Sequence, residues 1–83
     1  MDGKEKVGMI SHYFDKVGVA LVELSSDIRS GDRILIEGAT TSFEQVVESM
    51  QIEHETVTHA GQGQAIGLKV EEKVRKGDGV FRI

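Results

Sequence analysis

The chain contains no cysteine, no proline and no tryptophan among its 83 residues. Without cysteine it has neither a disulfide framework nor a thiolate metal site. No apolar run approaches the roughly 18 residues that a membrane-spanning helix needs. The charged start MDGKEKVGMI also lacks the apolar stretch of a signal peptide. We therefore expect a cytoplasmic protein without a membrane anchor.

An excess of positive charge is also absent: 14 acidic residues outnumber 10 lysines and arginines, and the formal net charge is −4. Proteins that bind nucleic acids nonspecifically carry a basic field, because counterion release drives their affinity. Any contact with nucleic acid should therefore be local and specific, or be helped by a partner. The length predicts a single domain over residues 1–83 with one modest core. Residues 1–5 are expected to be disordered.

Short apolar segments separated by ten glycines indicate an all-β fold. Alternation of apolar and polar residues predicts strands at 6–14, 17–24, 33–38, 44–54, 65–70 and 80–83. Because a sheet cannot safely leave long edges open, closure into a small barrel is the economical arrangement. The residues expected in its core are Val19, Leu21, Ile34, Ile36, Met50, Ile52, Ile66, Leu68 and Val80.

The stretch 40–57 is ambiguous in its local pattern. Helical spacing is present at Phe43, Val46, Val47 and Met50. Period-two alternation over residues 46–52 fits a strand equally well. The local pattern alone does not decide between helix and strand.

The chain contains nearly the same phrase twice, as IRSGDRILI and, at its C-terminal end, as VRKGDGVFRI. Gly31 and Gly77 suit a backbone position with positive φ. Asp32 and Asp78 can accept hydrogen bonds from nearby backbone N–H groups and hold the turn. Two interpretations remain open: the same turn chemistry used twice independently, or a pseudo-symmetric barrel whose halves enter their strands alike.

Three motifs, in their order and spacing, resemble the second domain of translation elongation factors that carry aminoacyl-tRNA. They are SMQIEHE at 49–55, GQAIGL at 63–68 and VRKGDGVF at 74–81. The resemblance implies a closed six-stranded Greek-key barrel of the translation-factor domain 2 type. It also implies that 44–54 forms a strand and not a helix. In that family the face around this strand and the following turn holds the aminoacyl acceptor end of tRNA.

Carried over by position, this resemblance implies that RNA or a partner contacts Gln51, Glu53, His54 and Gln64. His54 could stack on a terminal base, and the alternative is a histidine on a solvated strand face. The turns are expected to depend on Gly31, Asp32, Gly63, Gly67, Gly77 and Asp78.

A second resemblance is nearly as close. SHYF at 11–14, VESMQIEHE at 47–55 and GLKV at 67–70 resemble the barrels that end collagenase-like peptidases, although those tails have threonine in place of Ser11. Some members of that family are RNA-hydroxylation enzymes. The alternative function is therefore a protein-interaction module that docks on a collagenase-like peptidase or an RNA-modifying enzyme.

Catalysis is not indicated by any motif. The Gly-x-x-x-x-Gly-Lys-Ser/Thr run that cradles phosphates in GTPases is absent. Glu53, His54, Glu55 and His59 are metal-ligand types, but Glu53 and His54 would point to opposite faces of a strand. We expect a noncatalytic, translation elongation factor-like binding module without metal or cofactor. Its partner would be a tRNA end, ribosomal RNA or a separate enzyme subunit.

Overall fold

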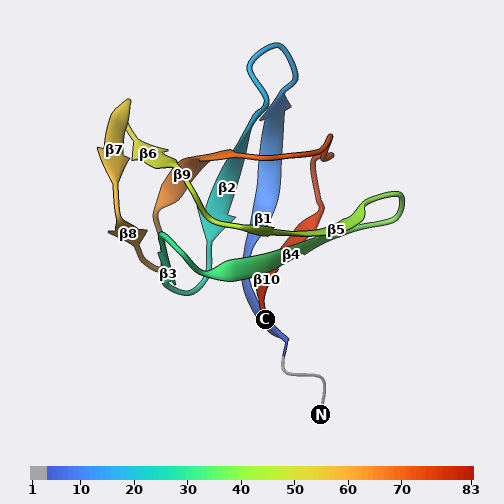
Figure 1. The fold of residues 1–83 in the computed structure, drawn as a ribbon, viewed down its shortest axis with the longest axis horizontal. Helices are drawn as coiled ribbons and strands as arrows, with labels where there is room; N and C mark the ends of the chain where they lie inside the picture. The colour runs from blue at the N-terminus through green and yellow to red at the C-terminus, as the bar shows by residue number, and fades with distance from the viewer. Residues whose placement is uncertain (1–3) are drawn as a thin grey trace.

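The computed structural model describes residues 4–83, which form antiparallel strands and turns (Figure 1). The strands are β1 (Glu5–Phe14), β2 (Val19–Leu24), β3 (Ile28–Arg29), β4 (Arg33–Glu37), β5 (Ser42–Val46), β6 (Met50–Ile52), β7 (Glu55–Val57), β8 (His59–Ala60), β9 (Ala65–Lys69) and β10 (Gly79–Arg82). Of the residues expected to be disordered, 1–3 lie outside the described part of the chain and Glu5 begins β1. No helix in residues 4–83 has the length and apolar character needed to cross a membrane.

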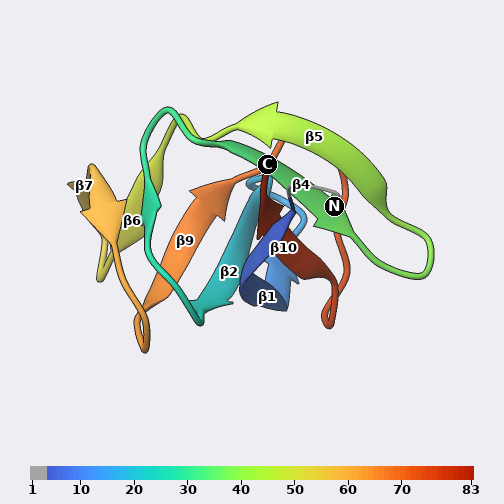
Figure 2. The same ribbon diagram turned by 90° about the horizontal axis from the view of Figure 1, so that it is seen from below.

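Eight strands form one curled, open sheet in the order β5-β4-β10-β1-β2-β9-β6-β7, and β3 pairs with β8 separately (Figures 1 and 2). The predicted all-β class is confirmed, whereas the closed six-stranded Greek-key barrel is wrong. The reason lies in residues 47–49. The β4–β5 pairing ends at Val46 and the chain joins β9 at Met50; the residues between make single backbone hydrogen bonds to the turn at Gly31–Asp32 and to Lys69 but form no strand across the opening.

The predicted strand 44–54 covers the end of β5, the connection 47–49, β6 and the turn that follows it, and no part of it is helical. Glu53 and His54 form the turn between β6 and β7, with φ of 51° and 70°. Two consecutive positive φ values are the signature of a type I′ hairpin. The expectation that Glu53 and His54 lie on opposite faces of a strand is therefore wrong, because both residues belong to the turn.

The core contains six of the nine residues predicted for it. These are Ile34, Ile36, Met50, Ile66, Leu68 and Val80. Val19, Leu21 and Ile52 are only partly buried. In β2 the buried residues are Ala20, Val22 and Leu24. The predicted register of this strand is wrong because β2 is apolar on both faces, so alternation did not distinguish the inner face from the outer one.

The two copies of the repeated phrase fold alike. Gly31 and Gly77 have φ of 96° and 95°, so both occupy the positive-φ positions that the sequence predicts. The Oδ2 atoms of Asp32 and Asp78 each accept the backbone N–H of the arginine three residues earlier, at 2.9 Å in both turns. The aspartates therefore hold the turns in the way expected from their type.

Each of these turns is also joined to a buried residue elsewhere in the chain. The N–H of Gly31 donates to the carbonyl of Val47, and the N–H of Val47 donates to the carbonyl of Asp32, both at 2.8 Å. In the second turn, the N–H of Gly77 donates to the carbonyl of Ile10, and the N–H of Ile10 donates to the carbonyl of Asp78, again at 2.8 Å. The equivalence favours the pseudo-symmetric interpretation of the repeated phrase.

The Gln45 side chain links β5 to the end of β9 across the open side of the sheet. Its side chain is buried, with 5% of the residue surface exposed. The Nε2 atom donates to the carbonyl of Lys69, and Oε1 accepts the N–H of Glu71, both at 2.9 Å. A side-chain amide thus takes the place of a backbone ladder between β5 and the end of β9.

Candidate functional site

The outer face of β2 and β9 forms the floor of a groove. On β2, Val19 and Leu21 alternate with the core residues and are partly exposed on this outer face. The β9 register places Gly67 opposite Leu21 and Ala65 opposite Glu23. Because glycine and alanine have almost no side chain, the surface is low along β9 and leaves a depression beside the larger residues of β2.

Two hairpins border this floor. The tip of the β1–β2 hairpin carries Phe14 and Val17, which are 46% and 59% exposed. On the other side stands the β6–β7 hairpin (Figure 1). The groove between them measures about 590 Å³ and is lined by Phe14, Val17, Val19, Leu21, Gln51, Glu53, His54, Ala65 and Gly67. We call this the outer groove, and its volume lies within the range of ligand-binding clefts.

The exposed apolar side chains at the hairpin tip sit on a well-bonded backbone. The carbonyl of Phe14 accepts the N–H groups of Val17 and Gly18 at 3.2 and 2.9 Å. The Nζ atom of Lys69 donates to the carbonyl of Val17 at 3.3 Å. The Phe14 ring lies 4.4 Å from that of His12 in an edge-on arrangement. The apolar end of the groove is therefore preformed in the free protein.

The opposite wall contains unusual backbone geometry. Glu53 and His54 both have positive φ, a region that costs a non-glycine residue roughly 1–2 kcal/mol. An Asn-Gly pair would satisfy the same turn with less strain. The turn itself thus does not explain why glutamate and histidine occupy these positions. Strained residues of this kind are concentrated at binding sites.

The structure brings together three of the four residues predicted to bind RNA or a partner. Gln51, Glu53 and His54 all line the outer groove. Gln64 does not line it. Its Oε1 atom accepts the N–H of Gly61 at 2.7 Å and closes the turn around Gly63, whose φ is 87°. Gln64 is therefore part of the turn that precedes β9.

The sequence pattern does not reveal the apolar half of the groove. It singles out neither Phe14 nor Val17 as a site residue, and it predicts Val19 and Leu21 for the core. One signal could have found them. The strand VALVEL is apolar on both faces up to Glu23, although a strand of a small barrel needs only one apolar face. Gly67, predicted as a turn residue, lies within β9 and forms part of the groove floor.

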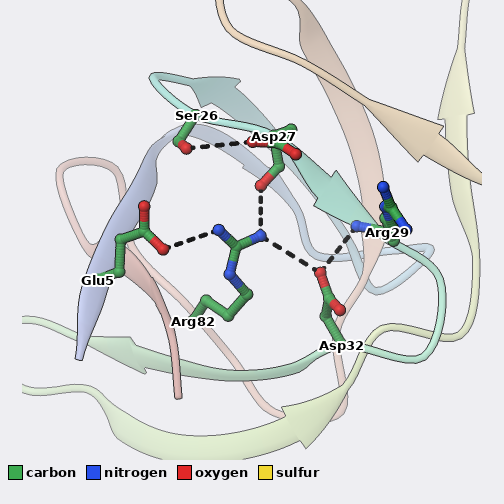
Figure 3. Close-up of polar contacts among 6 residues, drawn as sticks. All are labelled: Glu5, Ser26, Asp27, Arg29, Asp32 and Arg82. Atoms are coloured by element: carbon green, nitrogen blue, oxygen red, sulfur yellow. Dashed lines mark hydrogen bonds and ion pairs between the residues drawn. The ribbon is translucent and has the colours of Figure 1, made fainter. Parts of the chain in front are cut away.

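A polar cluster around Arg82 has a structural role (Figure 3). Its Nη2 atom donates to Glu5 Oε1 at 2.7 Å, and Nη1 donates to the carbonyl of Asp27 at 2.8 Å and lies 3.6 Å from Asp32 Oδ2. The hydrogen bond to Glu5, together with the nearby charges, raises the pKa of Arg82 above its ordinary value. The guanidinium ties β10 to β1 and to the first repeated turn.

Metal-ligand residues do not gather in the described part of the chain. Among residues 4–83, no three His, Asp or Glu side chains are arranged to hold a metal ion. Glu53 and His54 lie in the β6–β7 turn, whereas His59 lies in β8. The outer groove combines one carboxylate, one imidazole and one side-chain amide with apolar residues. Such a surface can bind a partner through apolar contact and a few directed polar contacts.

The chain is similar in sequence to proteases, although no protein-family model matches it. It is 44% identical over 79 residues to an uncharacterized protease of Methanocaldococcus jannaschii. It is 42% identical over 81 residues to a collagenase of Porphyromonas gingivalis. The two alignments cover 94% and 95% of this chain but 19% and 22% of the relatives. The chain thus spans about a fifth of the length of the curated relatives it matches.

The fold is that of the C-terminal domain of a Geobacillus thermoleovorans protein assigned to the U32 peptidases. Two crystal structures of that domain superpose with TM-scores of 0.87 and 0.89, at 24% and 23% sequence identity. They match 92% and 95% of this chain and 96% and 92% of theirs. These similarities support the resemblance to the tails of collagenase-like peptidases. They give no support to the resemblance to elongation factors.

Proposed function

We propose that this chain is a noncatalytic accessory module that docks on the catalytic part of a collagenase-like peptidase. The observation that carries the proposal is the asymmetry of the alignments. Nearly the whole of this chain corresponds to about a fifth of a protease and of a collagenase. The other parts of an active enzyme would come from elsewhere, either in the same polypeptide or as a separate subunit.

The chemistry of the outer groove supports a binding role. Its lining residues include no serine, threonine, cysteine or lysine, so the nucleophilic side chains that it offers are the carboxylate of Glu53 and the imidazole of His54. Phe14 and Val17 expose apolar surface on an ordered hairpin. Contiguous exposed apolar groups with a polar rim are typical of protein-interaction sites.

The rival role, contact with a tRNA acceptor end or with ribosomal RNA through Gln51 and His54, has weaker support. A net charge of −4 provides little attraction for a phosphate backbone. The proteases and collagenases that the chain resembles favour a protein partner, so RNA enters the experiments below as a competing outcome.

A binding measurement with the Methanocaldococcus jannaschii protease tests the proposal. The protease would be truncated to remove the segment that aligns with this chain, and the purified chain would be titrated into it by calorimetry. We expect a one-to-one complex. The matched control is the intact protease, whose own segment should occupy the docking surface and prevent binding. Failure of a folded, truncated protease to bind the chain would refute the proposal.

A further inference from the structure

The two ends of the outer groove differ in character. Phe14 pairs with Val19 in the β1–β2 ladder, so these residues and Val17 form an apolar end. Glu23 pairs with Ala65 at the other end of the floor. Gln51 pairs with Gly67, and Glu53, in the turn after β6, lines the groove together with Ala65. Glu53 therefore gives the far end of the groove an acidic side chain, whereas Glu23 belongs to the floor strand beside it but lines neighbouring depressions instead.

Charge at the two ends is also balanced differently. At the apolar end, the ammonium group of Lys69 is directed to the carbonyl of Val17. At the acidic end, neither Glu23 nor Glu53 takes part in an ion pair within residues 4–83. An acidic occupant would bring like charges together there, whereas a cation would complement the carboxylates.

We propose that the outer groove is the surface through which the module docks, and that its occupant is a segment of the peptidase carrying a bulky apolar side chain and a Lys or Arg. This inference rests on the function proposed above. The apolar side chain covers Phe14 and Val17, and the cation reaches Glu53. Gln51, between the two ends, can donate to or accept from the backbone of the segment.

The strand geometry sets the spacing within the occupant. Val19 and Glu23 are four residues apart on β2, which corresponds to about 13 Å along an extended strand. A Lys or Arg side chain can span part of that distance. The apolar and basic residues of the occupant are therefore about two to four residues apart if the segment lies extended along β2.

Val17→Glu tests the apolar end in the calorimetric assay with the truncated protease. Val17 is 59% exposed, so the substitution leaves the core unchanged while placing a charge in the groove. We expect binding to weaken about tenfold or more. The matched control is Val46→Glu, because Val46 is 37% exposed on β5 and does not line the groove. It should bind like the unmodified chain.

Glu53→Lys tests the acidic end. It keeps a long side chain at the same positive-φ position but reverses the charge that would face the cation. Binding should weaken, and the difference from the unmodified chain should shrink as salt is raised, because exposed charges are screened. Glu48→Lys is the matched control, since Glu48 is exposed in the connection between β5 and β6 and should leave affinity unchanged.

The outcomes separate this inference from the function on which it rests. If the unmodified chain does not bind the truncated protease, the proposed function fails and the inference falls with it. If Val17→Glu and Glu53→Lys bind like the unmodified chain, docking stands but the groove is not its surface. A concentration-dependent dimer that Val17→Glu abolishes would assign the groove to a second copy. Amide shifts at 51–54 on titration with CCA-ended RNA would assign it to RNA.

Discussion

Replacing Gln45 by leucine should destabilise the protein strongly, although glutamine in a strand usually tolerates substitution. The leucine keeps most of the side-chain volume but cannot form the hydrogen bonds to the carbonyl of Lys69 and the N–H of Glu71. An unsatisfied buried backbone group costs about 1–3 kcal/mol. Two such groups in a partly buried position give an expected loss of about 2–4 kcal/mol.

This loss is large compared with the total stability. A domain of 83 residues has a free energy of unfolding of about 4–12 kcal/mol, at 0.05–0.15 kcal/mol per residue. Urea unfolding followed by circular dichroism would measure the loss as a lower midpoint with an unchanged slope. Gln51→Leu is the matched control, because Gln51 is an exposed strand glutamine with no side-chain hydrogen bond within residues 4–83. It should change stability by less than about 0.5 kcal/mol.

The reasoning would be refuted if Gln45→Leu and Gln51→Leu unfolded at the same urea concentration. That result would mean that water satisfies the two backbone groups equally well. The side-chain bridge would then contribute nothing to closing the open side of the sheet, although Gln45 is buried.

Three further predictions concern the turns and the core. Gly77→Val should cost roughly 1 kcal/mol or more, because a φ of 95° strains any side chain although no atom lies near the added Cβ. Gly31→Val in the first copy of the repeated phrase should act alike. Variants that unfold at the same urea concentration as the unmodified chain would contradict this. Ile36→Ala should lower the free energy of unfolding by about 2–5 kcal/mol, and Leu21→Ala should lower it clearly less, since Ile36 is buried and Leu21 is partly exposed in the groove. Thermal melts in which Leu21→Ala is the less stable variant would contradict the β2 register. Replacing Glu53 and His54 by Asn-Gly should raise stability by about 1 kcal/mol and weaken docking, because the strain and the carboxylate disappear together; unchanged docking would show that these side chains have no binding role.

The parts of the fold that depend on local chemistry could be predicted from the sequence. Gly31 and Gly77 precede aspartates in two similar phrases, and glycine is the residue that positive φ demands. The β6–β7 turn could not be predicted in this way. Its positive-φ positions hold Glu53 and His54, which carry no turn signal, so the predicted strand 44–54 includes both turn residues.

The parts that depend on packing could not be read from the pattern. Alternation alone does not say which face of an apolar strand is buried, so Val19 and Leu21 were assigned to the core. Gln45 is a polar residue whose burial follows from the approach of β5 to the end of β9. The candidate site was half predictable for the same reason. Gln51 and His54 lie within one motif, whereas Phe14, in the separate motif SHYF, is brought to the same groove only by the fold.

The central claim, that this module docks on a collagenase-like peptidase through its outer groove, is tested most directly by mapping the contact. Backbone amide shifts of the labelled chain would be recorded as the truncated Methanocaldococcus jannaschii protease is added. We predict that the shifts concentrate at residues 14–21, 51–54 and 65–67, which contribute the groove. Shifts confined to β4 and β5 or to the cluster around Arg82, with the groove unaffected, would contradict the account.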